Sequence, residues 1–182
     1  GSGSSAKTRL LLDALLREGT LTTYAPLDVN AAALRDAGHA LCRDYPGLRV
    51  AATVTDLETD LALPGPALAP GPRLVAFLGS TLGNLDAAQR AAFHARLRAA
   101  LAPGDALLLG VDLVKDPARL VRAYDDAEGV TAAFNRNVLH VINRELGADF
   151  RPDAFDHRAV WNEPEERVEM RLRARTAQTV TI

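Results

Sequence analysis

The sequence of 182 residues contains one cysteine, Cys42, so it cannot form an internal disulfide bond. The neighbours of Cys42 predict a helix, on which we expect a buried or half-buried structural thiol. A single cysteine and the lack of a secretory signal favour a cytoplasmic location. The longest apolar runs, around Leu74–Leu78 and Ala106–Val114, are too short to cross a membrane, so none is expected as a partner.

The sequence also lacks an excess of charge of either sign, because its net charge is only −2. A nucleic-acid-binding protein usually has a basic stripe, so nucleic acid is not expected as a partner. Arg171, Arg173 and Arg175 alternate, which in a strand predicts one solvated face. The four histidines have no metal-ligand spacing, so we expect no metal site and a solvated or capping role for each of His39, His94, His140 and His157.

Hydrophobic residues make up 48% of the chain and charged residues 24%, which is typical of one soluble globular domain, here expected over residues 1–182. Periodicity and caps predict helices at Thr8–Glu18, Ala31–Asp44, Asp86–Leu101, Asp116–Asp126 and Val130–Leu146. Strands are predicted at Leu21–Val29, Leu48–Val54, Arg73–Leu78, Ala106–Val111, Ala159–Trp161, Val168–Leu172 and Thr176–Ile182, with a loop over Leu63–Pro72. Among these strands, Arg73–Leu78 and Ala106–Val111 are expected to be buried and parallel.

The alternation of helices and strands predicts an α/β fold with a doubly wound, Rossmann-like sheet. Such a sheet opens with a strand before its first glycine-rich turn, whereas this sequence begins inside a turn. We therefore expect an incomplete core, with the first strand, which lies at the sheet centre, and a C-terminal part both absent.

The glycine-rich start, Gly1–Thr8, is the first candidate for ligand binding. A glycine-rich turn that leads into a helix lets backbone N–H groups approach a ligand closely. The spacing of glycine and lysine excludes a phosphate-binding P-loop. The alternative for the residues Gly1–Ser5 is a flexible linker.

Acidic side chains follow the next two predicted strands. Asp28 stands where α/β nucleotide-binding folds place a carboxylate that accepts hydrogen bonds from ribose hydroxyls; its alternative role is a helix N-cap, for which Asn30 is better suited. In the segment Thr55–Glu58, Asp56 could accept from an adenine amino group while Leu57 packs on the ring. The alternative for this segment is a solvated turn.

The segment Phe77–Leu85 carries two glycines and several small polar side chains directly after a predicted strand. Ligands of open α/β sheets bind beyond the carboxyl ends of the strands. The amide of Asn84 offers both a donor and an acceptor, which suits a zwitterionic amino acid. The alternative is a place in the N-cap region of the next helix, where Asp86 could also serve.

Four segments together resemble the S-adenosylmethionine-dependent histidine Nα-methyltransferase family, which makes hercynine on the way to ergothioneine. These segments are GSGSSAKT, FLGSTLGN, LLLGVDLVKDPARLVRAYDD and GVTAAFNRNVLHVINRELGADF. The resemblance covers essentially all 182 residues. The choice of histidine as substrate rests on this resemblance alone.

The resemblance implies S-adenosyl-L-methionine as cofactor and L-histidine, or a similar amino acid, as substrate. The cofactor-binding residues it implies are Gly1, Gly3, Lys7, Asp28, Asp56 and Leu57, although the family often has an aromatic residue where Leu57 stands. The substrate-binding residues it implies are Asn84, Tyr124 and Met170. No residue is assigned a catalytic role, and the implied reaction is up to three successive methylations of the α-amine.

The family's N-terminal segment and its imidazole-recognising C-terminal segment have no counterpart here, which leaves substrate specificity and turnover by this chain alone open; the oligomeric state is not predicted. Two alternatives are a related methyltransferase acting on another amino-acid amine, such as a prenylated tryptophan, and a cofactor-binding fragment without turnover. A nicotinamide-dependent oxidoreductase is disfavoured because the third glycine of its fingerprint is absent. Outside the resemblance, Tyr124 could be an ordinary residue of an amphipathic helix.

Overall fold

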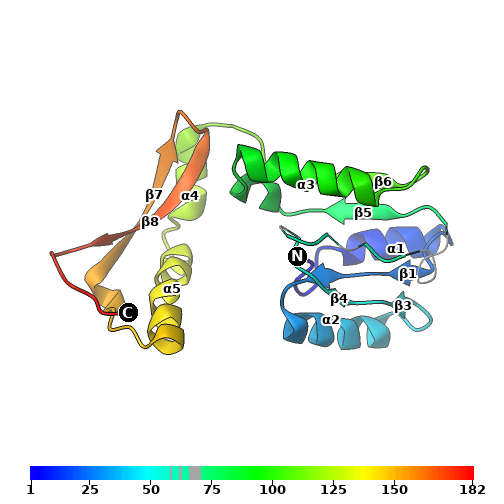
Figure 1. Cartoon of the computed structure of the whole chain (residues 1–182), viewed down its shortest axis with the longest axis horizontal. Helices are drawn as coiled ribbons and strands as arrows, with labels where there is room; N and C mark the ends of the chain where they lie inside the picture. Colours follow the sequence, from blue (N-terminus) through cyan, green and yellow to red (C-terminus); the bar gives the residue numbers. More distant parts are fainter. Residues whose placement is uncertain (58, 62, 66–70) are drawn as a thin grey trace. The chain divides into compact units, whose positions relative to one another are not determined.

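The computed structural model describes residues 1–57, 59–61, 63–65 and 71–182, which form two compact units, Gly1–Val111 and Asp112–Ile182 (Figure 1). Each unit combines helices and strands, which confirms the predicted α/β class. The assignment of residues 1–182 to a single domain stays a prediction.

Over its described residues, the first unit contains three α-helices, a short 3-10 helix and six strands. The helices are α1 (Arg9–Arg17), α2 (Ala31–Asp44), α3 (Ala87–Ala100) and the 3-10 helix η1 (Thr81–Asn84). The strands are β1 (Thr23–Tyr24), β2 (Leu27–Asp28), β3 (Arg49–Val50), β4 (Thr53–Val54), β5 (Leu74–Phe77) and β6 (Ala106–Leu109).

These strands form three parallel pairs, β1–β3, β2–β4 and β5–β6. Among the residues that the structure describes, no strand pairing joins β1 or β2 to β5. Instead, a cavity of 780 Å³ is lined by residues of β1, β2 and β5 and by the glycine-rich turn. The predicted sheet is therefore present as separate parallel pairs.

Local sequence signals place the helix ends of this unit. The side chain of Asn30 accepts a hydrogen bond of 3.0 Å from the backbone N–H of Ala33, so Asn30 caps α2 as expected. Asp86 and Gln89 form a capping box at the start of α3. Gly19 follows α1 with φ +67°, a left-handed conformation that glycine adopts without strain.

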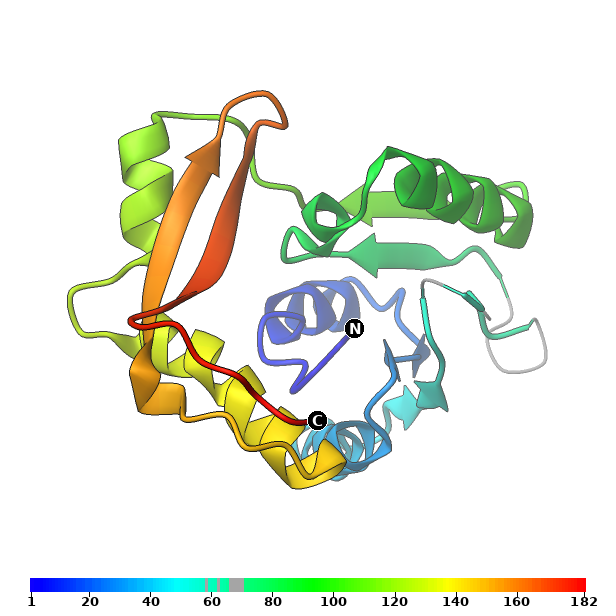
Figure 2. The same ribbon diagram turned by 60° about the vertical axis from the view of Figure 1, so that its left-hand side comes forward.

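Two apolar clusters form the core of the first unit. Leu12 of α1 packs with Leu41 of α2 and with Leu48, while the second cluster joins α3 to the segment around η1. In that second cluster Phe93 and Leu97, one helical turn apart, are both buried. Helix α3 accordingly lies along the β5–β6 pair (Figure 2).

Several sequence-based expectations for this unit are wrong in detail. The predicted strand Leu21–Val29 is two short strands, because Pro26 has no N–H to donate within a ladder. Strand β6 is exposed at every position rather than buried, because the elements that the structure describes do not cover its side chains. Cys42 is exposed because its neighbour Leu41 takes the buried face of α2. Of the predicted loop Leu63–Pro72, residues 66–70 lie outside the described residues.

The second unit is an antiparallel hairpin against which two helices pack. Its elements are α4 (Pro117–Tyr124), α5 (Val130–Leu146), the short 3-10 helix η2 (Pro152–Ala154), β7 (Phe155–Asn162) and β8 (Arg167–Ala174). Both α4 and α5 contact both strands. The strands of the hairpin are longer than predicted. The predicted strand Thr176–Ile182 is not a strand; instead, the backbone of Thr181 forms hydrogen bonds with the backbone N–H and the side-chain carboxylate of Asp149.

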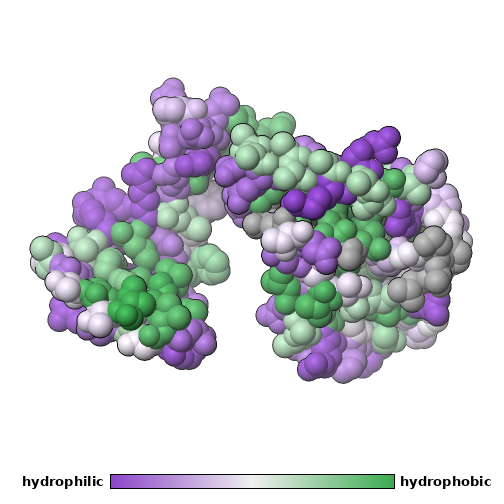
Figure 3. All heavy atoms as spheres, viewed as in Figure 1, coloured by the Kyte–Doolittle hydropathy of each residue, from purple (hydrophilic) through white to green (hydrophobic). Residues whose placement is uncertain are grey.

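Alternation along the hairpin gives it a charged face and a helix-facing face. On the charged face, Glu169 accepts from Asn162 at 2.8 Å and from the guanidinium groups of Arg171 and Arg167 at 3.0 and 3.1 Å. These bonds, with that from Asn162 the strongest, lower the pKa of Glu169 to about 2. Figure 3 shows hydrophilic residues gathered over the turn that joins β7 to β8. Arg171 and Arg173 are exposed on β8, as their alternation predicted, and Arg175 is exposed just beyond it.

Within the described part of the chain, no helix has both the length and the apolar character needed to cross a bilayer.

Candidate cofactor and substrate site

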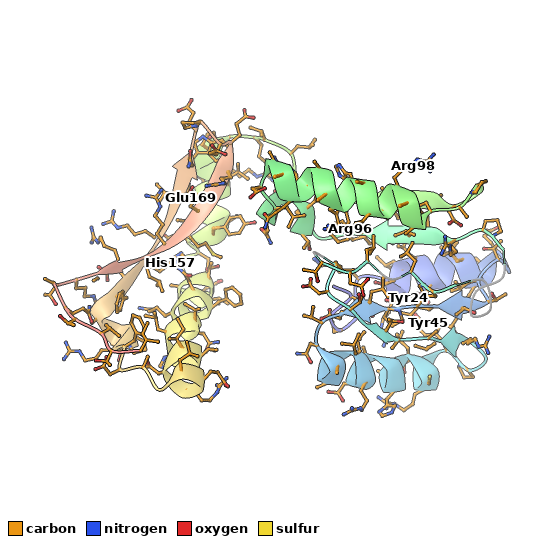
Figure 4. All side chains as sticks on the ribbon, viewed as in Figure 1. Tyr24, Tyr45, Arg96, Arg98, His157 and Glu169 are labelled. Atoms are coloured by element: carbon orange, nitrogen blue, oxygen red, sulfur yellow. The ribbon has the colours of Figure 1, made fainter. Side chains whose placement is uncertain are left out.

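The glycine-rich turn folds onto the end of β2. The backbone N–H of Ser2 donates a hydrogen bond of 2.8 Å to the carbonyl of Leu27. Gly3 (φ +50°) and Ser5 (φ 55°) both take left-handed conformations, which turn the chain into α1. Ser5 is 2% exposed, and its hydroxyl lies 2.9 Å from that of Tyr24 (Figure 4). Hydrogen bonds to Tyr24 of β1 and Leu27 of β2 therefore hold the turn in place.

The carboxylate of Asp28, at the end of β2, accepts hydrogen bonds from two backbone N–H groups. One carboxylate oxygen accepts from the N–H of Gly3 at 2.8 Å and the other from the N–H of Asn30 at 3.0 Å. Partial burial raises the pKa of Asp28, but the hydrogen bonds from Asn30 and Gly3 outweigh it, so the pKa lies below its ordinary value. A Cβ atom added to Gly1 would collide with the Asp28 carboxylate, so the close approach requires glycine.

The turn also contributes to the cavity of the first unit. Gly1, Gly3 and Lys7 line the cavity, together with Leu57 beyond β4. The hydroxyl oxygen of Ser2 is buried and makes no hydrogen bond within the described residues. A buried polar atom without a partner is costly and is often satisfied by a ligand. The turn and the end of β2 therefore bring together glycine backbone, the Asp28 carboxylate and the Ser2 hydroxyl, which makes no hydrogen bond within the described residues.

Asp56 and Leu57 follow β4 directly. The parallel register pairs Asp28 with Val54, which brings the segment after β4 beside the end of β2. Asp56 is exposed and accepts a hydrogen bond of 3.0 Å from the hydroxyl of Thr59, whereas Leu57 is half-buried against the cavity. The remaining carboxylate of the predicted segment, Glu58, lies outside the described residues.

Asn84 is the last residue of η1, which follows β5. Ser80 opens this short helix with φ 60° and donates from its N–H to the carbonyl of Gly110 at 3.1 Å. Since Asp86 caps α3, the side chain of Asn84 is not used as its N-cap and is exposed. Asn84 thus lies past the carboxyl end of a parallel strand, the position expected for ligand binding.

The other two predicted substrate residues belong to the second unit. Tyr124 is the last residue of α4 and is 41% exposed, and Met170 on β8 is 38% exposed. The register pairs Met170 with Ala159, which places it on the same face of the hairpin as His157. The structure thus places both residues on the side of the hairpin that α4 and α5 cover.

His157 is a residue whose importance the sequence did not reveal. Its side chain is only 2% exposed, whereas His39, His94 and His140 are exposed, as predicted for them. Nε2 of His157 lies 2.7 Å from the carbonyl oxygen of Tyr124, at the end of α4. His157 therefore has the capping role that was one of its two expected roles, in a buried position that only the pairing of β7 with β8 could reveal.

Comparison with known proteins shows the family to which the chain belongs. A sequence profile described as histidine-specific methyltransferase, SAM-dependent, matches residues 1–182. Histidine N-alpha-methyltransferases of Mycolicibacterium smegmatis and Mycobacterium tuberculosis are 59% and 55% identical, each over 100% of this chain and 56% of the relative. Ergothioneine biosynthesis protein 1 of Neurospora crassa is 32% identical over 81% of this chain and 17% of that protein.

These matches assign the chain to a class of proteins described as S-adenosylmethionine-dependent methyltransferases. Within that class, the chain belongs to the histidine-specific methyltransferase family, which confirms the resemblance inferred from the sequence. The chain spans about half (56%) of the length of the curated histidine methyltransferases that it matches.

Proposed function

We propose that the protein transfers methyl groups from S-adenosyl-L-methionine to the α-amine of L-histidine, up to the trimethylated product. The observation that carries this proposal is the contact between the turn and Asp28, where Gly1 and Gly3 bring backbone against a carboxylate of lowered pKa. A carboxylate that stays ionised at neutral pH is suited to accept hydrogen bonds from both ribose hydroxyls.

The residues of the first unit fit this cofactor. Asp28 would hold the ribose, and the Ser2 hydroxyl and the turn backbone would lie against the remaining polar groups. Leu57 would pack on the adenine ring, with Asp56 beside it. When bound, S-adenosylmethionine supplies an electrophilic methyl group on a sulfonium, which leaves as a neutral thioether.

Asn84 and Tyr124 would position the amino acid rather than move protons. The amide of Asn84 can donate to the substrate carboxylate or accept from its amine. The Tyr124 phenol, with an unperturbed pKa of about 10, is a poor base at neutral pH. The substrate amine must lose a proton to expose its lone pair, and orientation of that nitrogen toward the methyl carbon supplies most of the acceleration. Met170 would contribute apolar contact near the same substrate.

We also propose that the separate strand pairs belong to one doubly wound, Rossmann-like sheet that is incomplete, with the position of its central strand, between β1–β2 and β5, not filled by any strand that the structure describes. Both groups are parallel, and residues of β1, β2 and β5 line the cavity between them. Arg73 and Phe77 accept from β6 through their carbonyls, so the backbone groups of Ala76 point to the cavity edge. Fast hydrogen exchange of the Ala76 amide would support an incomplete sheet with this edge open, and slow exchange would contradict it.

Mass spectrometry of the purified protein with S-adenosylmethionine and a panel of free amino acids tests the proposed function. We expect mono-, di- and trimethylated histidine, with little product from tryptophan or other amino acids. Product from another amine would identify a different substrate, and binding of the demethylated cofactor without product would identify a cofactor-binding chain without turnover. A cytoplasmic location remains a prediction from the single cysteine.

A further inference from the structure

His157 lies at the meeting point of all four main elements of the second unit. Its ring, on β7, is 2% exposed and has a partner at each nitrogen (Figure 4). Nδ1 lies 3.0 Å from the side-chain nitrogen of Asn135 on α5, and Nε2 lies 2.7 Å from the carbonyl oxygen of Tyr124 on α4. The carboxylate of Asp125 is 4.0 Å from Nε2, beyond hydrogen-bond distance.

The partners determine which ring nitrogen carries the proton. The carbonyl of Tyr124 can only accept, so Nε2 must donate to it. The amide nitrogen of Asn135 also donates to the carbonyl of Arg171 on β8 at 3.3 Å, which fixes the donor end of that amide toward His157. Nδ1 must therefore accept. Every donor in this network has an acceptor only when His157 is neutral and protonated at Nε2.

This network acts on a carbonyl that the helix leaves unsatisfied. Tyr124 is the last residue of α4, and the last four carbonyls of a helix have no intrahelical partner. The hydrogen bond from His157 ties that carbonyl to the hairpin and so sets the position of the Tyr124 backbone. Met170 lies on the same face of the hairpin as His157. The buried ring thus contacts the backbone of Tyr124 and shares a face of the hairpin with Met170.

We propose that His157, in its neutral Nε2–H form, is a positioning residue that holds Tyr124 in place for the amino-acid substrate. The inference rests on the proposed role of Tyr124 in substrate binding. His157 itself does not contact the substrate; it acts through the Tyr124 carbonyl.

The first test uses His157→Phe, His157→Gln and the matched control His140→Phe at an exposed histidine of α5. Because the hydrogen bond to the Tyr124 carbonyl is lost together with that from Asn135, His157→Phe should raise KM for histidine by about three- to tenfold, with kcat and the Kd of S-adenosylhomocysteine changed by less than about twofold. The Gln amide can donate toward the Tyr124 carbonyl, so His157→Gln should restore KM. An equal loss in all three quantities for His157→Phe, without rescue by Gln, would show a general folding role and overturn the proposal.

A double-mutant cycle separates positioning through Tyr124 from an independent effect. In a Tyr124→Ala background, His157→Phe should change KM by no more than about twofold, because the side chain it positions is already gone. Additive effects on KM would contradict the proposal.

The tautomer can be measured without any activity, which separates this inference from the proposed function. Nitrogen NMR of the unaltered protein should show a proton on Nε2 of His157 and none on Nδ1. A proton on Nδ1 would overturn the hydrogen-bond assignment even if histidine is methylated. Absence of histidine methylation together with an Nε2 proton would instead refute the proposed function and with it the role in substrate positioning, leaving the network as a helix cap only.

Discussion

The backbone N–H of Gly3 donates a hydrogen bond of 2.8 Å to the carboxylate of Asp28, 25 residues further along the chain. This bond joins the glycine-rich turn to the end of β2, and Gly1 lies so close to the same carboxylate that a Cβ there would require the carboxylate or the turn to move. The two segments therefore form one cradle, which we propose holds the cofactor. The next two predictions test the charge of Asp28 and the close contact between Gly1 and the Asp28 carboxylate.

Replacement of Asp28 by asparagine removes the charge that we assign to ribose binding. It also leaves an amide N–H facing the N–H of either Gly3 or Asn30. Because a charged hydrogen bond is lost, we expect the Kd of S-adenosylhomocysteine to rise about tenfold to a hundredfold, measured by calorimetry. The matched control is Asp36→Asn, at an exposed position of α2, which should leave the Kd unchanged. Equal affinities of all three proteins would remove Asp28 from the site.

Replacement of Gly1 by alanine tests the close approach directly. The added Cβ would overlap a carboxylate oxygen of Asp28, so either the turn or the carboxylate must move. We expect weaker cofactor binding with an unchanged far-ultraviolet circular dichroism spectrum. Gly38→Ala is the control, since a Cβ there meets no atom within 4 Å and alanine favours the α2 helix. Cofactor affinity that is equal in Gly1→Ala and Gly38→Ala would contradict the tight fit.

Asp105 provides a test of stability against pH. Its carboxylate, 3% exposed, accepts from the side chain of Arg73 and from the backbone N–H of Ala102, and these bonds hold its pKa well below its usual range. A carboxyl group with a lowered pKa stabilises the folded state above its unfolded pKa of about 3.9, and this contribution is lost as the pH falls below that value.

Asp105→Asn should therefore lower the midpoint of thermal unfolding at pH 7 and reduce the further loss of stability on acidification below about pH 4. Circular dichroism melts over a series of pH values measure both effects. Asp36→Asn, which leaves the Arg73–Asp105 pair intact, should melt like the unaltered protein. If Asp105→Asn shows the unaltered acid dependence, another carboxylate is responsible for it.

Local signals allowed much of the fold to be predicted from sequence. Asn30 and Asp86 mark helix starts through side-chain chemistry that depends only on neighbouring residues, and α2 spans the predicted residues. Features that depend on partners distant in sequence were harder to predict. Strand β6 is exposed, and the apolar run at Ala106–Val111 contains no signal for which elements cover the faces of the strand.

In the candidate site, too, local features could be predicted from the sequence, whereas features that depend on distant residues could not. The turn and Asp28 follow from their sequence positions, and the structure brings them into contact. His157 could not be found this way, since its environment is created by Tyr124, Asn135 and Arg171 on three other elements. A histidine in an alternating strand looks the same whether its face meets solvent or two helices. Asn84, Tyr124 and Met170 rest on the family resemblance and stay predictions as substrate residues.

The most direct test of the account is mass spectrometry of L-histidine incubated with S-adenosylmethionine and either the unaltered protein or Asn84→Ala. We predict methylated histidine, up to the trimethylated form, with the unaltered protein. Loss of a substrate hydrogen bond should reduce kcat/KM of Asn84→Ala by about tenfold or more while cofactor affinity is retained. Unmethylated histidine from the unaltered protein, or equal product from both proteins, would contradict the account.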